Sequence, residues 1–308
     1  MKISILGAGN VGGLTAMRLA QEGAGDIFLI DIAKGLAQGK AFDIEDAQQA
    51  LKYDYRICGT DDLQASAGSD IIVVTAGLPR KPGMTREDLL HKNALILKDV
   101  CLAVKQGSPR CIFIVVTNPL DLMTRFALKA TGFKPSRVLG MGVSLDAARF
   151  ANLISKELKV PVSDIDACVI GSHGEGMLPL PRFTTIKGVS LEELVDDKKI
   201  GTLAQKTVGR GAEIVGLLGS GSAYFAPSAA ITQIVKAIAK DEKRTIGVSA
   251  YLDGEYGAKD VCLGVPCRLG KDGIEKIIEL GLDTQELEAF LVSATRLKEQ
   301  FSGSAYLA

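Results

Sequence analysis

The chain has 308 residues, of which 47% are hydrophobic and 23% charged, the proportions of a globular protein long enough for two domains. Lys plus Arg and Asp plus Glu both number 36, so the formal net charge is zero. This balance argues against a nucleic-acid-binding or basic membrane-surface protein, and no apolar run is long enough to span a bilayer.

The six cysteines include no C-x-x-C pair, and neither histidine lies where it would complete a zinc motif. We therefore expect no metal site and interpret the cysteines as reduced thiols in the core. The first residues pass directly into an apolar segment, without the regions of a signal peptide, so we expect a cytoplasmic location.

Up to residue 142, short aliphatic segments alternate with helical patterns such as Val11–Glu22 and Glu87–Val104. Unbroken aliphatic runs are typical of strands covered on both faces, as in a parallel sheet. The predicted strands are Lys2–Gly7, Asp26–Asp31, Ile71–Thr75 and Ile112–Thr117, with Val138–Met141 as a further candidate. We predict an α/β domain over residues 1–142, built on a Rossmann-type doubly wound parallel sheet.

The first predicted strand leads into a glycine-rich turn and then a helix. The turn has the pattern G-x-G-x-x-G, formed by Gly7, Ala8, Gly9, Asn10, Val11 and Gly12. The first glycine allows the tight turn, the second lets the backbone approach a diphosphate, and the third lets the helix pack on the strand. Backbone N–H groups at the helix N-terminus would face the phosphates. By itself the pattern is weak, because other glycine-rich turns share it.

Asp31 closes the second predicted strand, 19 residues after Gly12. A carboxylate at this place can accept hydrogen bonds from ribose hydroxyls and would repel a 2′-phosphate. The predicted cofactor is therefore NAD rather than NADP. The alternative is a strand-capping aspartate beside a structural turn.

The third long strand ends at Thr75 and leads into segment 75–86, whose Pro and Gly content is typical of a mobile lid. Ligands bind at the carboxyl ends of strands in open α/β sheets. Arg80 and Arg86 lie in a stretch without acidic residues, so they have no local partner, although incidental charge on a solvated lid is the alternative. Asn118 ends the next strand, where it can hydrogen-bond a substrate oxygen.

After residue 142 the order of predicted helices and strands becomes that of an α+β domain, and we predict a catalytic and substrate-binding domain over residues 143–308. Its predicted elements are a helix at 145–158, a strand end at 169–171, helices near 200–216 and 226–239, strands at 246–252 and 258–269, and a helix at 286–301. Because no Pro/Ser-rich linker separates the halves, we expect a continuous, packed interface near Gly142.

The chain contains two histidines. His91 lies in a helical stretch, and we interpret it as a packing or solvated residue. His173 lies in a glycine-rich loop where packing does not require an imidazole. Oxidation of an alcohol needs a group with a pKa near 7 that takes the hydroxyl proton as hydride leaves, and His173 is the candidate.

Asp146 could fix the tautomer of that imidazole. Asp146 and Arg149 stand at i and i+3 of a predicted helix, so Arg149 could bind a substrate carboxylate beside it. The alternative is an ordinary intrahelical salt bridge.

Five motifs occur along the chain in the order found in the lactate/malate dehydrogenase superfamily. They are the glycine turn, P-R-K-P-G-M-T-R, V-T-N-P, L-D-x-x-R and G-S-H-G-E. The chain resembles this family over nearly its whole length, and is most similar to its malate dehydrogenases of the lactate-dehydrogenase-like type. The resemblance implies NAD-dependent, reversible oxidation of (S)-malate to oxaloacetate, with His173 as proton acceptor and Asp146 as its partner.

The resemblance also implies how a substrate is held. Arg149 would bind the C1 carboxylate, Arg86 would polarise the C2 oxygen and Asn118 would orient it. In addition to the glycine turn and Asp31, the resemblance implies cofactor contacts from Asn93, Val116, Thr117 and Asn118. Arg80 stands where the family's lactate dehydrogenases typically have Gln, and its guanidinium matches the C4 carboxylate of oxaloacetate, whereas pyruvate would leave it unpaired.

Three other functions share parts of this pattern. A lactate-type 2-hydroxy-acid dehydrogenase differs in substrate alone, an NAD-requiring glycosidase would need metal ligands, and an NAD-binding regulator would have no use for the catalytic set. The family forms dimers and tetramers, and a helix such as Ala37–Ala50 could serve as an interface. We therefore expect a homo-oligomer without choosing between two and four subunits.

Overall fold

The computed structural model describes residues 1–78 and 85–307. In the first half, the aliphatic runs form the parallel strands β1 (Lys2–Leu6), β2 (Asp26–Ile30), β4 (Ile71–Val74), β5 (Ile112–Val115) and β6 (Val138–Gly140). With β3 (Ile57–Thr60) they follow the order β3-β2-β1-β4-β5-β6, and every neighbouring pair is parallel. This is the doubly wound order, and it confirms the predicted fold class. The strand order reverses between β1 and β4, and ligands of open α/β sheets bind at the carboxyl ends of the strands beside such a reversal.

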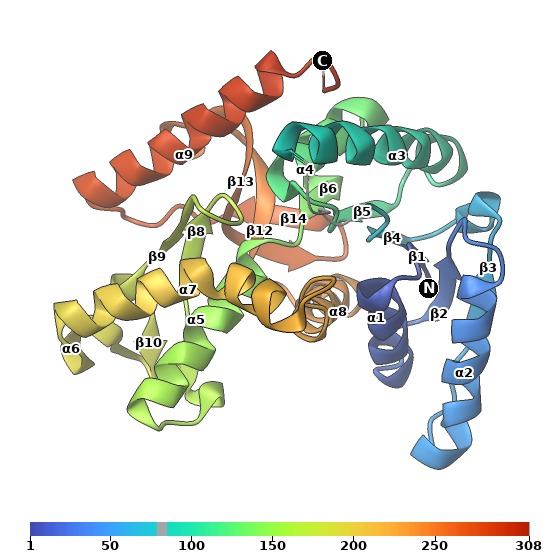
Figure 1. Ribbon diagram of the computed structural model, residues 1–308, viewed down its shortest axis with the longest axis horizontal. Coiled ribbons are helices and arrows are strands. Elements are labelled where there is room, and N and C mark those ends of the chain that lie inside the picture. The colour runs from blue at the N-terminus through green and yellow to red at the C-terminus, as the bar shows by residue number, and fades with distance from the viewer. Residues whose placement is uncertain (79–84, 308) are drawn as a thin grey trace.

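Successive residues of these strands enter two different cores, one on each face of the sheet. Ile71 and Val73 belong to the first core, whereas Ile72 and Val74 belong to the second. The first core is covered by α1 (Asn10–Gln21), α2 (Leu36–Leu51) and α8 (Phe225–Ala239), and the second by α3 (Arg86–Gly107) and α4 (Leu120–Thr131). Figure 1 shows α1 and α8 side by side, and α3 beside α4 across the sheet.

The sheet continues into the second half through one antiparallel pair, where Gly140 of β6 lies opposite Ser249 of β12 (Arg244–Asp253). Beyond it lie β13 (Lys259–Gly270), β8 (Val169–Gly171) and β9 (Met177–Pro179), with β14 (Gly273–Ile277) paired to β13. A small separate sheet contains β7 (Ile165–Asp166), β10 (Thr185–Ile186) and β11 (Val189–Ser190). The halves are therefore packed and continuous, and the division into domains after residue 142 stays a prediction.

The helices of the second half are α5 (Val143–Leu158), α6 (Leu191–Leu194), α7 (Asp197–Leu218) and α9 (Thr284–Gly303), in addition to α8. Figure 1 shows α5 and α7 at the lower left and α9 above them. In the described part of the chain, no helix has the length and apolar character needed to cross a membrane.

Several elements were not predicted. The strand β3 is a half-exposed edge strand with the sequence ICGT, so it lacks the aliphatic run that marks its neighbours. The strands β7, β9, β10 and β11 have two or three residues each, too few to show a periodicity. The helix α4, by contrast, lies between two predicted strands, in a segment with the expected helical composition, and it buries the polar residues Asp121 and Thr124 beside its apolar ones.

The glycine turn joins β1 to α1 with almost no space to spare. Gly7 has a φ of +109°, a conformation that residues with a Cβ rarely adopt. A Cβ on Gly12 would lie 1.8 Å from the Gly7 carbonyl oxygen. The third glycine of the pattern therefore permits close packing of the helix on the strand end, as expected.

We predict that Gly12→Ala lowers the free energy of unfolding by about 2–3 kcal/mol, because the added methyl group displaces the turn from the helix. Gly201→Ala is the matched control: Gly201 lies exposed within α7, and its Cβ would meet nothing within 4 Å. It should raise stability by about 0.5–1 kcal/mol. Urea unfolding followed by circular dichroism measures both, and equal stability of the two variants would contradict this account.

Candidate active site

Among the described residues, no side chain caps the N-terminus of α1. Its N-cap is Gly9, with no side-chain hydrogen bond, whereas α3 and α9 both begin with a capping box. Gly9 and Asn10 are exposed. The backbone N–H groups of this first turn are therefore open to an anion, and the helix dipole favours a negative charge there. These features fit the diphosphate of a dinucleotide.

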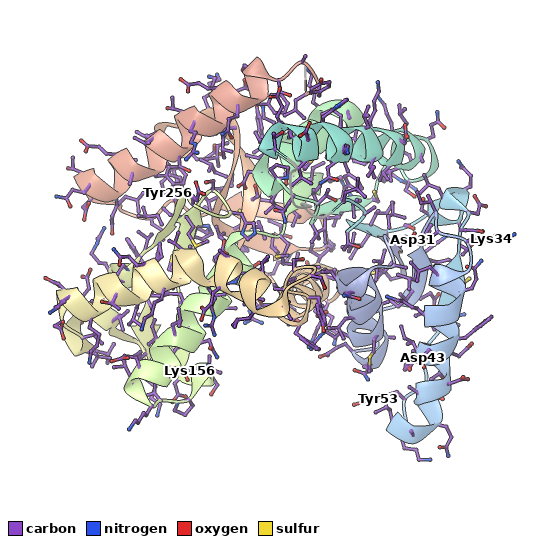
Figure 2. All side chains as sticks on the ribbon, viewed as in Figure 1. Asp31, Lys34, Asp43, Tyr53, Lys156 and Tyr256 are labelled. Atoms are coloured by element: carbon purple, nitrogen blue, oxygen red, sulfur yellow. The ribbon has the colours of Figure 1, made fainter. Side chains whose placement is uncertain are left out.

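Asp31 lies beside this turn, at the end of β2. Its carboxylate accepts the backbone N–H groups of Ala8, at 2.6 Å, and Ala33, at 2.9 Å. Each oxygen retains a lone pair for a ribose hydroxyl. Figure 2 shows Asp31 next to α1 and α2, with Lys34 farther out at the edge of the molecule. Sequence reasoning missed Lys40, whose ammonium group donates a 3.1 Å hydrogen bond to the Gly9 carbonyl.

Hydrogen bonds also join the carboxyl ends of β4 and β5. Thr117 donates to the Ala76 carbonyl at 2.6 Å. Asn93 is buried, accepts the Leu78 N–H at 2.8 Å and donates to the Asn118 carbonyl at 2.7 Å. Both ends of the Asn93 amide are thus engaged by protein groups. Val116 is half-buried, and Asn118 is exposed and lines a cavity.

The cavity has a volume of about 980 Å³ and lies between the start of α3, the loop 172–178 and α9. His173 and Asn118 lie on its wall, together with Leu120, Asp121, Val292 and Arg296. Arg149 and the glycine turn are not part of its lining. Its size suits a small organic ligand.

Asp146 holds two functional side chains at once. Its Oδ2 atom lies 2.8 Å from Nδ1 of His173, and its Oδ1 accepts a 3.1 Å hydrogen bond from Nη1 of Arg149. Asp146 is fully buried, and the side chains of His173 and Arg149 are 18% and 12% exposed. The intrahelical salt bridge and the pairing with His173 therefore coexist on one carboxylate.

Arg149 keeps hydrogen-bonding capacity after this contact. Its Nε is buried without a hydrogen-bond partner in the described structure. A Cβ on Gly211 of α7 would lie 3.4 Å from Nη1, so the guanidinium packs against a helix at a position without a side chain. A buried guanidinium with free donors suits a ligand carboxylate, which can accept two parallel hydrogen bonds.

The surroundings of His173 favour its protonated form. Burial is the largest single influence and lowers the pKa of His173, but the charge of Asp146, the hydrogen bond to it and the charge of Asp121 together raise this pKa by more. Asp121 acts in the same direction and Arg149 in the opposite one, and the net result is a raised pKa. The imidazole is therefore a stronger base than a free histidine side chain.

Sequence reasoning missed Asp121. This residue of α4 is buried, accepts the backbone N–H of His173 at 2.8 Å and accepts the Ser249 hydroxyl at 2.6 Å. Burial raises the pKa of its carboxyl to about 6. The sequence feature that could have indicated Asp121 is its place three residues after Asn118, at the start of a helix.

Two predicted residues come from the lid. Arg80 lies outside the residues that the structure describes, as does the rest of 79–84. Arg86 is the first residue of α3, directly after the capping residue Thr85. The second histidine, His91, stacks on Tyr306 with ring centroids 3.6 Å apart, which agrees with a packing role.

We predict that Asp146→Asn lowers the titration midpoint of His173 by about one pH unit or more, because the variant loses the nearest negative charge. Nuclear magnetic resonance of protein labelled with ¹³C in its histidine rings measures this directly, since the chain has two such signals. His91 is the internal control and should titrate unchanged. An unmoved His173 signal in the folded variant would contradict the electrostatic role of Asp146.

Comparison with known proteins gives a consistent result. Residues 1–140 match the family model of the lactate/malate dehydrogenase NAD-binding domain, and residues 143–305 match that of the lactate/malate dehydrogenase alpha/beta C-terminal domain. The malate dehydrogenase of Methanosarcina mazei is 48% identical over 302 residues, covering 98% of each chain. That of Roseiflexus sp. is 47% identical and covers 95% of each.

Solved structures of the same family are also similar to this chain. The malate dehydrogenase from Picrophilus torridus has a TM-score of 0.92 and 43% identity, covering 97% of this chain and 95% of that one. A lactate dehydrogenase from Cryptosporidium parvum, complexed with lactic acid and nicotinamide adenine dinucleotide, has a TM-score of 0.92 and 35% identity, covering 96% and 95%. The motifs, the fold and these matches together show that the chain belongs to the lactate/malate dehydrogenase family.

Proposed function

We propose that this chain is an NAD-dependent malate dehydrogenase that reversibly oxidises (S)-malate to oxaloacetate. The observation that carries the proposal is the buried contact of Asp146 with both His173 and Arg149, which combines a proton acceptor with a carboxylate-binding cation. The relatives from Methanosarcina mazei and Roseiflexus sp., which are 47–48% identical over nearly the whole chain, are both named malate dehydrogenase.

Bound NAD supplies the hydride acceptor, and the chain supplies binding, orientation and proton transfer. The Nδ1 atom of His173 is engaged by Asp146, so Nε2 is the ring atom that takes the hydroxyl proton of malate. The carboxylate of Asp146 then stabilises the imidazolium. Arg149 holds the C1 carboxylate, Asn118 orients the C2 oxygen and Arg86 polarises it.

The proposed cofactor site includes the glycine turn, Asp31 and the segment Val116–Asn118. Its support lies in the open N–H groups at the start of α1 and the Asp31 carboxylate beside them. We propose that Asn93 acts by holding Asn118, because its amide is bonded to that residue's carbonyl and to Leu78.

The raised pKa of His173 sets the pH dependence of each direction. Malate oxidation requires the neutral imidazole, so it should increase as the pH rises through this pKa. Oxaloacetate reduction requires the imidazolium and should decrease over the same range. A raised pKa extends reduction towards higher pH.

Arg80 carries the choice of substrate in this proposal. The solved relatives include both malate and lactate dehydrogenases with TM-scores of 0.92, so the fold does not separate the two activities. A second cation matches the second carboxylate of oxaloacetate, and pyruvate would leave it unpaired in a closed site at a cost of several kcal/mol.

We predict that Arg80→Gln lowers kcat/KM for oxaloacetate by about 100-fold or more and raises it for pyruvate. The absorbance of NADH, followed with each substrate, measures both. His173→Asn is the control and should bind NADH normally but show no turnover. Unchanged preference in Arg80→Gln would contradict the substrate assignment, and reduction of pyruvate rather than oxaloacetate by the parent protein would favour the lactate-type alternative.

We also propose that the chain forms a homo-oligomer. Two helices carry large exposed apolar side chains, and such patches mark interaction surfaces. They are Leu36, Phe42 and Leu51 on α2, and Val215, Leu217 and Leu218 on α7. Figure 1 shows these helices on different sides of the molecule. A cytoplasmic location and the two-domain division after residue 142 remain part of the proposal, and the six unpaired cysteines support a reducing compartment.

We predict that Phe42→Glu and Leu217→Glu each shift the protein towards monomer, because a buried, unpaired carboxylate opposes association. Sedimentation velocity measures the change. Val162→Glu is the control, since Val162 is also an exposed apolar residue but lies on neither helix. A monomeric parent protein would refute the oligomer proposal.

A further inference from the structure

A second buried carboxylate, that of Asp121, contacts the backbone of the proposed proton acceptor His173. Asp121 is the second residue of α4, in the first half of the chain. Its Oδ2 accepts the backbone N–H of His173 at 2.8 Å, and its Oδ1 accepts the hydroxyl of Ser249 on β12 at 2.6 Å. One side chain thus connects a helix N-terminus, the catalytic loop and a central strand.

The cost of burying this charge indicates that Asp121 is more than a structural link. Its side chain is 4% exposed, and both hydrogen bonds come from neutral donors. A buried carboxylate without a cationic partner is destabilising, so a neutral side chain of the same shape would hold the loop at lower cost. The N-terminus of α4 favours the ionised form. Because burial raises its pKa to about 6, the carboxyl is ionised in most molecules at neutral pH.

Among the described residues, the charged groups that act on the pKa of His173 come from two helices. From α5, Asp146 and Arg149 face it with opposite charges, and from α4 Asp121 adds a second negative charge. On β13 the nearby thiol of Cys262 stays neutral, because burial raises its pKa. Two carboxylates therefore act on one imidazole, against one guanidinium.

We propose that Asp121 is a positioning residue for His173, which holds the backbone of the catalytic loop and whose negative charge stabilises the imidazolium formed during malate oxidation. The proposal deepens the function proposed above and rests on His173 as the proton acceptor. The Asp121 carboxylate contacts the protein backbone and a hydroxyl, and it acts through His173.

Asp121→Asn separates the charge from the geometry. The amide oxygen of Asn can accept the His173 N–H, and its NH₂ group can donate to the Ser249 hydroxyl oxygen, which has lone pairs available. The loop therefore stays connected while the negative charge is lost. Ser249→Ala makes the complementary change: it removes one donor, so that the carboxylate ionises less readily.

The experiment is a pH titration of the ¹³C-labelled histidine rings in the protein without cofactor or substrate. Asp121→Asn should lower the His173 midpoint by about one pH unit, and Ser249→Ala should lower it by less. His91, stacked on Tyr306, is the internal reference and should not move. In turnover assays, the acid limb of kcat/KM for malate should shift to lower pH together with the His173 signal in Asp121→Asn.

A merely structural role gives a different result. Folded Asp121→Asn with an unchanged His173 midpoint would overturn the proposal, even if its turnover were reduced. If Asp121→Asn does not fold, an unmoved midpoint in Ser249→Ala overturns the proposal instead. Because the titration requires no substrate, failure of the parent protein to reduce oxaloacetate would refute the proposed function and leave the charge coupling to be decided by the titration.

Discussion

The buried carboxylate of Asp146 is the interaction on which the proposed chemistry depends. It has two oxygens and gives one to the His173 imidazole and the other to the Arg149 guanidinium. The same group therefore orients both the proposed proton acceptor and the proposed carboxylate-binding cation. Full burial keeps water from competing for either contact and strengthens both.

The central sheet brings this cluster to the cofactor side of the molecule. The parallel strands end at one edge, where the glycine turn and Asn118 follow β1 and β5. The pairing of β6 with β12 carries the sheet into the second half, so the loop containing His173 extends from the same sheet. Asp121 adds a connection across the two halves, because it lies on α4 and holds the backbone of His173. The relative position of base and cofactor site thus depends on one continuous structure.

Local sequence patterns were sufficient to predict those features that depend on residues close together in the sequence. Unbroken aliphatic runs predicted four parallel strands and one further candidate, because both faces of such strands are buried. The spacing of Asp146 and Arg149 predicted a shared helix face, and the structure has them in contact. The short strands of the second half lack such a pattern, and their pairing is decided by distant partners.

By itself, the sequence determined the doubly wound sheet, the glycine turn, the carboxylate at Asp31 and the candidate residues His173, Asp146 and Arg149. Each of these follows from local spacing or from a residue type in a particular turn. Only the tertiary structure decided which distant groups meet them: Ser249 reaches Asp121 across 128 positions, and Asp121 reaches His173 across 52. In a sequence, a carboxylate near the start of a helix can be a cap, a surface charge or a second partner of the proposed proton acceptor. Folding alone decides among these, because it sets which donors and charges surround the carboxylate once water is excluded.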